Sequence, residues 1–423
     1  MNNKNIIIRD RLDREFYMRA EAGIEIKKWL LKNYIPRSSI VLKVNGAISD
    51  DDSYIIDEAD TITIDMVRAY QLPEYCTMLG LWENDRTFSN NSKPAKTIYS
   101  SELLWFNQNG VSEIHKASMN EAEFVEWLEQ RFVDGIVDFN LIKENQSICL
   151  ALSGGRDSLA LLYLLRRTAH KLPKHNLIGC TVSPTAASSE DVQIAKESIN
   201  NLGVTDYSIL DLNYVNETMN LKNGFDSAID SILQSSGRGL SIACWHGIMR
   251  ACVERFSQER GISTIAFGYQ HEDLLASILR SQQLGVWFGE SAQEKKWGDF
   301  SLISPLWTIT KKELTIYLNI IAPKKHSSQG SPTDFDRGDH NRDINYFAAD
   351  LLTSTIPGYG FNLFEGHKRS SQWKNNITYY KCHNCATTYS NLGISLPELN
   401  VKYCNTCLSL IKNGEIERLR IVE

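Results

Sequence analysis

The 423-residue sequence predicts an α/β protein built on a doubly wound parallel sheet, with a small α+β unit before the sheet and a cysteine-rich segment after it. Three observations lead to this class. Strand and helix patterns alternate from about residue 146, the first 70 residues show short strands around one helix, and four of the nine cysteines lie near the C-terminus. Alternating strands and helices are typical of parallel sheets, because a crossover helix returns the chain to the start of the next strand.

The composition is that of an ordinary globular protein. Hydrophobic residues make up 42% of the chain and charged residues 23%. The formal net charge of −6 does not indicate a nucleic-acid binder, whose surface usually carries a basic patch. No apolar run approaches the roughly 18 residues of a membrane helix, and Met1–Asp10 lacks the apolar core of a secretory signal. We therefore expect a cytoplasmic location.

The first 72 residues show the element order of a β-grasp, or ubiquitin-like, unit. A hairpin, a helix and two further strands are expected at Ile6–Ile8, Glu15–Met18, Gly23–Tyr34, Ile40–Val44 and Thr61–Met66. The stretch Leu42–Gly46, followed by Asp57–Ile64, resembles the sulfur-carrier branch of that group. The unit is not itself such a carrier, because residues 67–70 lack a terminal Gly-Gly. Two interpretations stay open: a module that docks a sulfur carrier, another protein or a substrate, and a spacer without chemistry.

A linker and helical segment is predicted over residues 73–145, followed by the main α/β domain over 146–375. The segment contains a polar stretch at 84–96 and a helix at Asn120–Phe132. Strands of the main domain are expected at Ser147–Leu152, Leu177–Val182, Tyr207–Leu212 and Ser263–Phe267, and helices at Leu159–Ala169, Ser189–Leu202, Leu240–Arg260 and Asp273–Gln283. This alternation predicts parallel strands with crossover helices.

The sharpest motif is a glycine-rich loop between the first strand and the first helix of this domain. Its residues are Ser153, Gly154, Gly155, Arg156, Asp157 and Ser158. Two glycines let the backbone approach an anion closely, and successive amides at a helix N-terminus attract phosphate. Asp157 is expected to hold a metal ion or to order the loop. The loop has neither the Walker pattern nor the dinucleotide fingerprint. The alternative interpretation is a Gly-Gly turn capped by serines.

The motif resembles the PP-loop of the N-type ATP pyrophosphatases, and later segments resemble the tRNA 2-thiouridine and 2-thiocytidine synthetases and the tRNA-isoleucine lysidine synthetases of that family. The resemblance covers about residues 146–360. It implies cleavage of ATP between the α and β phosphates, with Mg²⁺, and transfer of AMP to a carbonyl or carboxyl oxygen. Arg156 stands where many members have lysine.

The resemblance also implies roles for individual residues. Thr181 and Val182 are expected to hold adenine through their backbone. Gly268 and Asp273 match a Gly-His-x-x-Asp-Asp segment in which Tyr269 replaces the histidine, and Asp273 is expected to hold the metal or the phosphates. Residues 337–344 resemble a segment that faces substrate. The expected stabilisers of the leaving pyrophosphate are Arg156 and Lys312.

Cys244 matches the first cysteine of a Cys-x-x-Cys that thiolases of this type carry in a long helix, where it helps to bind an iron–sulfur cluster or forms a catalytic pair. Gly247 replaces the second cysteine, which argues against a three-cysteine cluster. Two interpretations of Cys244 stay open: a thiol that relays sulfur as a persulfide, and a small core residue.

The last four cysteines predict a zinc ribbon over residues 376–423. Cys382 and Cys385 form one Cys-x-x-Cys pair, and Cys404 and Cys407 form another after eighteen intervening residues. Four thiolates close a tetrahedral zinc site without an open position, so we expect a structural ion. The alternative is two disulfides, which a reducing cytosol disfavours.

The sequence therefore predicts an ATP-consuming, adenylating enzyme. The first hypothesis is a sulfurtransferase that activates a carbonyl oxygen, with tRNA as the expected substrate. The second keeps the ATP chemistry and uses an amine, as in an amidotransferase or ligase acting on a protein or a small molecule. The third is a nucleotide-binding sensor or scaffold without turnover.

Overall fold

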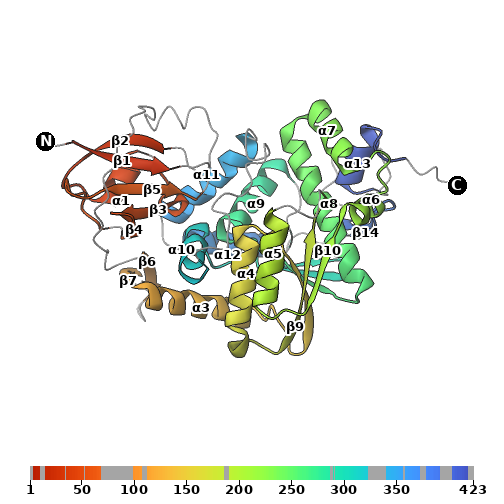
Figure 1. Ribbon diagram of the computed structural model, residues 1–423, viewed down its shortest axis with the longest axis horizontal. Coiled ribbons are helices and arrows are strands. Elements are labelled where there is room, and N and C mark those ends of the chain that lie inside the picture. The colour runs from red at the N-terminus through yellow and green to blue at the C-terminus, as the bar shows by residue number, and fades with distance from the viewer. Residues whose placement is uncertain are drawn as a thin grey trace. The chain divides into compact units, whose positions relative to one another are not determined.

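The computed structural model describes residues 3–9, 15–33, 35–51, 53–67, 99–106, 112–184, 190–285, 289, 291–322, 340–355, 358–371, 378–390 and 403–417 (Figure 1). The chain forms two compact units. Unit 1 comprises Met1–Phe132, Gln270–Ala276 and Thr308–Leu363, and unit 2 comprises Val133–Tyr269, Ser277–Trp307 and Phe364–Glu423. Each unit gathers segments that are distant in sequence, so the domain limits at 72, 145 and 375 stay predictions. No helix among the described residues is both long and apolar enough to cross a membrane.

Unit 1 contains a five-stranded sheet in the order β2-β1-β5-β3-β4. The elements are β1 (Asn3–Arg9), β2 (Glu15–Glu21), α1 (Ile26–Lys32), β3 (Ile40–Val44), β4 (Ala47–Ile48) and β5 (Ile62–Met66). The first and last strands pair in parallel, whereas β1 with β2 and β3 with β5 pair antiparallel. The sheet is therefore mixed, and the β-grasp assignment of this unit stays a prediction.

A helix from late in the sequence completes the core of this sheet. The core includes Ile6, Trp29, Leu42, Ile62 and Ile64. Tyr346 and Phe347 of α11 (His340–Thr355) pack against it. Ser38 donates its hydroxyl hydrogen to the Asp350 carbonyl at 2.8 Å. The N-terminal sheet is therefore packed into a larger unit.

The other elements of unit 1 are short strands and helices. They are the 3-10 turn η1 (Arg37–Ser39), the hairpin β6 (Tyr99–Phe106) and β7 (Ser112–Met119), α10 (Lys311–Ile321), and parts of α3 (Glu121–Val137), α9 (His271–Leu284) and α12 (Tyr359–Ser371). Thr310 caps α10 in a reciprocal box with Glu313, which satisfies two helix-end amides.

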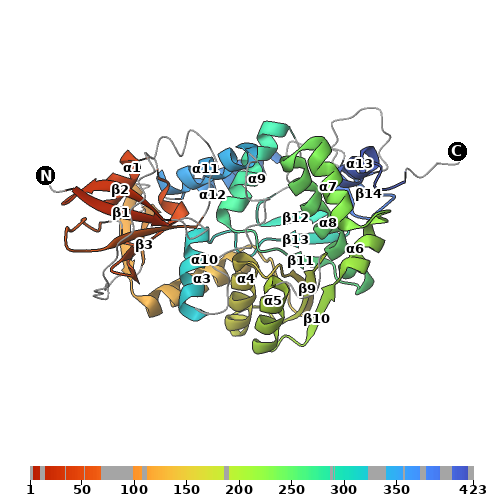
Figure 2. The ribbon, with the colours of Figure 1, turned by 45° about the horizontal axis from the view of Figure 1, so that its top comes forward.

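Unit 2 is built on a six-stranded sheet in the order β10-β9-β8-β11-β13-β12 (Figure 2). Its strands are β8 (Gln146–Ala151), β9 (His175–Val182), β10 (Asp206–Leu210), β11 (Thr264–Ala266), β12 (Glu294–Trp297) and β13 (Phe300–Ile303). All neighbouring pairs are parallel except β12 with β13, which pair antiparallel. The predicted parallel sheet is confirmed, with one antiparallel edge strand that was not foreseen.

Helices cover both faces of this sheet, as a doubly wound fold requires. On one face lie α4 (Arg156–Arg167) and α5 (Glu190–Asn201), side by side in both views (Figures 1 and 2). A side-chain carbon on Gly179 of β9 would meet Ile199 of α5 at 2.4 Å. Successive strand residues point to opposite faces. Cys180 therefore faces away from α5, toward Cys252 of α8 (Arg238–Glu259).

The structure corrects several predicted limits. The strand expected to reach Leu212 ends at Leu210, because Asp211 caps helix α6 (Leu212–Met219) by accepting a hydrogen bond from the Tyr214 amide at 3.0 Å. The helix expected from Leu159 begins at Arg156, inside the glycine-rich motif. The remaining elements are η2 (Ala169–Lys171), α7 (Phe225–Ser236), β14 (Tyr379–Lys381), β15 (Thr388–Ser390) and α13 (Asn405–Lys412). The polar stretch 84–96, residue 189 and residues 337–339 lie outside the described residues.

Candidate functional site

The glycine-rich loop connects β8 to α4 and folds around its two serines. The Ser153 and Ser158 hydroxyl oxygens lie 3.1 Å apart, and the Ser153 amide donates to the Ser158 hydroxyl at 3.2 Å. The Ser158 hydroxyl in turn donates to the Gly155 carbonyl at 3.0 Å. The N-cap residue of α4 is Gly155, which has no side chain to accept a first-turn amide. The loop therefore presents the positive end of a helix, as phosphate binding requires.

Only glycine fits at the tip of the loop. Gly154 has φ +79°, and a side-chain carbon there would lie 2.1 Å from the backbone carbonyl oxygen of Asp191. Asp191 belongs to α5, so the first turns of two neighbouring crossover helices meet at this glycine. The sequence analysis expected the glycines to let the backbone approach an anion. In the structure, the close contact that requires glycine at position 154 is with the backbone of Asp191.

The loop lies where the order of the strands reverses. After β8 the chain builds β9 and β10 on one side, and then returns to place β11 on the other side of β8. In open α/β sheets, ligands bind beyond the carboxyl ends of the strands at such a switch point. Gly268 follows β11 at this place, and a side-chain carbon on it would lie 2.9 Å from the Ser158 amide nitrogen. The structure therefore brings Gly268 against the loop, as a site shared by both segments requires.

Thr181 and Val182 end β9, the strand beside β8. Thr181 is 1% exposed, and its hydroxyl accepts a hydrogen bond from the Tyr207 hydroxyl at 2.8 Å. Both residues therefore lie at the same edge of the sheet as the loop. Their contact with adenine stays a prediction.

Two predicted site residues belong to unit 1. Asp273, in the first turn of α9, accepts a hydrogen bond from the Gln270 amide at 3.4 Å. The ammonium group of Lys312 lies 2.7 Å from an Asp50 carboxylate oxygen and donates to the Arg37 carbonyl at 3.0 Å. The Lys312 side chain is 3% exposed, and burial lowers its pKa to about 8. These contacts give Lys312 a role in holding α10 on the N-terminal sheet, and its expected role at pyrophosphate stays a prediction.

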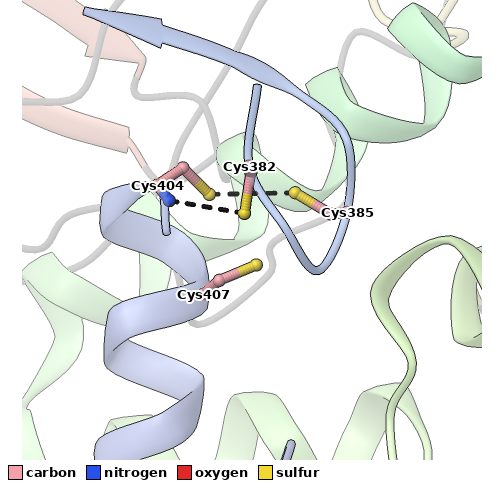
Figure 3. Close-up of side chains that lie close together, drawn as sticks. All are labelled: Cys382, Cys385, Cys404 and Cys407. Carbon is pink, nitrogen blue, oxygen red and sulfur yellow. Dashed lines mark hydrogen bonds between the residues drawn. The ribbon is translucent and has the colours of Figure 1, made fainter. Parts of the chain in front are cut away.

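The four C-terminal cysteines converge on one point (Figure 3). Cys382 and Cys385 come from the loop after β14, while Cys404 and Cys407 come from the start of α13. All four sulfur atoms lie within 4.8 Å of one another, and those of Cys385 and Cys404 are 3.8 Å apart. A tetrahedral ion with Zn–S bonds of about 2.3 Å requires sulfur atoms about 3.8 Å apart. The spacing therefore fits one metal ion, whereas a four-iron cube would hold its ligands farther apart.

A buried glutamate that the sequence analysis missed anchors this ribbon on α8. One Glu254 oxygen accepts hydrogen bonds from the Thr387 hydroxyl at 2.8 Å and the Thr388 amide at 2.9 Å. The other accepts from Arg250 at 2.7 Å, and Arg250 lies over the ring of Trp297 at 4.5 Å. Glu254 is 2% exposed. The available signal for this anchor was a glutamate among the apolar residues Cys252, Val253 and Phe256 of a long helix.

A curated tRNA-cytidine(32) 2-sulfurtransferase from Psychromonas ingrahamii is 26% identical to this chain over 191 residues, which are 44% of this chain and 56% of that protein. A protein of the same name from Neisseria meningitidis is 26% identical over 194 residues, or 44% of this chain and 55% of that protein. The chain thus spans little more than half the length of these relatives. No protein-family model matches it.

Among solved structures, the U34-tRNA thiolase of Methanococcus maripaludis with its 4Fe–4S cluster matches 75% of this chain and 95% of that chain. The TM-score is 0.52 and the identity is 20%. The fold is that of the PP-loop ATP pyrophosphatases. The glycine-rich loop at the switch point is accordingly the PP-loop of this chain.

The long helix of this PP-loop chain does not fit the cluster that the resemblance implies. A side-chain carbon on Gly247, the position of the second cysteine, would lie 2.0 Å from the Thr406 hydroxyl oxygen of α13. Cys244 is 2% exposed, and burial raises the pKa of its thiol to about 11. Among the described residues, the four ribbon cysteines form the one cysteine group with metal-binding spacing. The ribbon helix thus fills the space beside Cys244.

Two further cysteines of the PP-loop domain are equally enclosed. The sulfur atoms of Cys149 and Cys180 lie 3.6 Å apart on neighbouring strands, and the two residues are 0% and 1% exposed. They lie in the layer between the sheet and α8. Such cysteines behave as small apolar core residues.

Proposed function

We propose that this chain uses ATP to adenylate a carbonyl oxygen of a tRNA base and then exchanges that oxygen for sulfur. The observation that carries the proposal is the PP-loop, whose helix end and two serines stand at the switch point of the sheet. The similarity to two tRNA-cytidine(32) 2-sulfurtransferases supports tRNA as the substrate class. A substrate of this kind supports the expected cytoplasmic location.

The residues of the PP-loop have separable roles in this reaction. Ser153, Ser158 and the first-turn amides of α4 bind the β and γ phosphates. Arg156 neutralises charge on the departing pyrophosphate. Asp157, in the first turn of α4, provides a carboxylate of the kind that binds Mg²⁺. When bound, Mg²⁺ neutralises phosphate charge and so favours cleavage between the α and β phosphates.

The covalent steps balance with ATP and a sulfide-level donor. The carbonyl oxygen of the base attacks the α phosphorus, the bond to the β-phosphate oxygen breaks, and pyrophosphate leaves. A hydrosulfide then attacks the activated carbon, the carbon–oxygen bond breaks, and AMP leaves with that oxygen. The sulfur proton passes to solvent. Because Cys244 is buried, the donor delivers sulfur directly to the activated carbon, and the N-terminal unit is our candidate for docking a protein that carries it.

We propose zinc for the four-cysteine site. Zn²⁺ does not change its oxidation state in proteins, and it favours tetrahedral coordination by thiolates. Both properties suit a site that stabilises structure. This site takes no part in the ATP chemistry, because all four thiolates bind the ion and no coordination position is open to substrate.

A second candidate function is favoured by the contact between Gly247 and Thr406. Because α13 fills the position of a cluster cysteine, an amine is the alternative nucleophile to displace AMP, and it would make the enzyme an amidotransferase or ligase acting on a protein or a small molecule. The PP-loop and the adenylation step would be unchanged. A nucleotide-binding sensor is the third candidate.

One assay separates the three candidates. AMP and pyrophosphate release from ATP is measured with bulk tRNA, with sodium sulfide as donor, and without either; digested RNA is then analysed for thionucleosides by mass spectrometry. RNA-stimulated AMP release with thiolated base is the expected result. AMP release that RNA does not stimulate, but that an amine acceptor does, would favour the ligase. Nucleotide binding without pyrophosphate release under any condition would leave the sensor.

A further inference from the structure

An exposed aromatic ring, Tyr269, stands beside the PP-loop, next to the half-buried ring of Phe267. Tyr269 is 42% exposed, although its ring is large and mostly apolar. It stacks on Phe267, with ring centroids 5.5 Å apart and an angle of 29° between the ring planes. An exposed aromatic ring that is supported by a second ring is a suitable platform for a planar ligand, because the supporting ring restricts its movement.

The glycine between the two rings, Gly268, holds the ring pair against the PP-loop. Gly268 lies against the first turn of α4, where an added side-chain carbon would be 2.9 Å from the Ser158 nitrogen and 3.1 Å from the Asp157 carbonyl carbon. The Cα atom of Tyr269 is about 3.8 Å from that of Gly268. Tyr269 is therefore next to the PP-loop.

The strand order indicates which planar group Tyr269 meets. The residues expected to hold adenine, Thr181 and Val182, end β9, while the PP-loop follows β8 and Tyr269 follows β11. Neighbouring strands are about 4.8 Å apart, so the ends of β9 and β11 lie about 10 Å apart, on opposite sides of β8 and the PP-loop that follows it. A planar group beside Tyr269 is therefore the acceptor of AMP and not the adenine of ATP.

We propose that Tyr269 stacks on the nucleobase that is to be adenylated, and so sets the preference for an unpaired RNA base. The inference rests on the proposed function. Sequence-specific RNA recognition commonly uses unstacked bases that lie on aromatic side chains. The tyrosine offers a larger and less polar ring than the histidine of the related segment, which enlarges the area available for stacking on a base.

The test compares RNA affinity and ATP use in two variants of the full chain. Stacking of one base on an aromatic side chain corresponds to a loss of about 5- to 150-fold in affinity on change to alanine. We expect this loss for bulk tRNA in Tyr269→Ala, measured by fluorescence anisotropy, and less than about twofold change in Tyr269→Phe, which keeps the ring. The Michaelis constant for ATP is measured in the same preparations. Tyr380→Ala is the matched control, because Tyr380 stacks on Tyr389 at 5.7 Å and 29° within the ribbon.

Each outcome decides the inference. Loss of RNA affinity in Tyr269→Ala alone, with rescue by phenylalanine, supports stacking on the acceptor base. An increase in the Michaelis constant for ATP without loss of RNA affinity would overturn it, as would equal defects in Tyr269→Ala and Tyr269→Phe. If the wild type releases AMP in response to tRNA but Tyr269→Ala binds RNA normally, the inference fails and the proposed function stands. If the wild type neither binds tRNA nor responds to it, both fail.

Discussion

A side-chain carbon on Gly247 would lie 2.0 Å from the hydroxyl oxygen of Thr406, so helices α8 and α13 touch where only a hydrogen atom fits. The Cβ and Cγ2 atoms of Thr406 would lie 3.2 and 3.3 Å away, so the contact stays tight even when the threonine hydroxyl rotates away. The ribbon helix and the long helix of the PP-loop domain are therefore packed as one core.

Gly247→Ala should destabilise the protein. Alanine normally stabilises a helix interior relative to glycine by up to about 1 kcal/mol, but overpacking costs about 1–3 kcal/mol and should dominate here. Denaturant unfolding measures the change. Gly366→Ala is the matched control, because Gly366 lies in α12 with no atom within 4 Å of an added carbon, and it should be neutral or stabilising. In Gly247→Ala with Thr406→Ala, stability should recover; additive losses would show that the contact is unimportant.

Gly247→Cys should not create an iron–sulfur cluster, although it restores the Cys-x-x-Cys pattern with Cys244. The new side chain meets Thr406, so anaerobic reconstitution with iron and sulfide should leave the labile sulfide content and visible spectrum equal to those of wild type. Stoichiometric labile sulfide in this variant, absent from wild type, would contradict the packing argument.

Gly154→Ala should abolish AMP release. The residue combines φ +79° with a 2.1 Å approach to the Asp191 carbonyl oxygen, so the loop has to move away from α5 to admit a methyl group. Gly261→Ala provides the control, because Gly261 has φ +66° but no neighbouring atom within 4 Å. The control carries only the backbone strain of about 1–2 kcal/mol and should keep its turnover. Equal activities of the two variants would argue against a tightly packed phosphate loop.

Metal removal should release α13 and expose Cys244. Elemental analysis should find about one zinc per chain, as a four-thiolate site binds one ion. After chelation, Cys244 should react with a thiol reagent, since its hydrogen-bond neighbour Ser409 belongs to α13. Cys252, 0% exposed on the same helix beside Thr218 of α6, should remain protected and serves as the internal control. Peptide mapping by mass spectrometry reports both, and labelling of Cys244 before chelation would contradict the structure.

Acid should destabilise unit 1 through Glu313. Burial raises the pKa of this carboxyl, but the charge and hydrogen bond of Arg131, with help from Thr310 and Tyr99, lower it more, and the pKa lies below the ordinary 4.5. Below pH 4.5 the unfolded state therefore binds more protons than the folded state. The stabilisation is fully present above that pH and is lost as the pH falls through the folded pKa.

The Glu313→Gln variant tests whether Glu313 causes this loss of stability at low pH. The variant lacks the ionisable group, so its unfolding free energy should fall less steeply than that of wild type between about pH 5 and 3, and it should be less stable at pH 7, where wild type keeps the buried ion pair. Parallel pH profiles in the two proteins would show that Glu313 contributes nothing to acid sensitivity. Glu144→Gln, a change at an exposed glutamate of unit 2, is the control and should follow wild type.

The sequence by itself determined the features that short segments encode. The Ser153–Ser158 motif, the parallel strands of the central sheet and the cysteine pairs at 382–385 and 404–407 depend on local backbone needs, hydrophobic runs and ligand spacing. Such patterns are complete within a few residues, so they can be interpreted without knowledge of what lies across the core.

The tertiary structure decided which distant segments share a core. Lys312 resembles a catalytic lysine in sequence, yet it pairs with Asp50 of the N-terminal sheet; Gly247 resembles a lost ligand, yet Thr406 fills its place; Glu254 carries no motif, yet it anchors the ribbon. Each of these roles arises from burial against residues more than 100 positions away. Burial of this kind depends on how whole elements pack, and no spacing within the sequence encodes it.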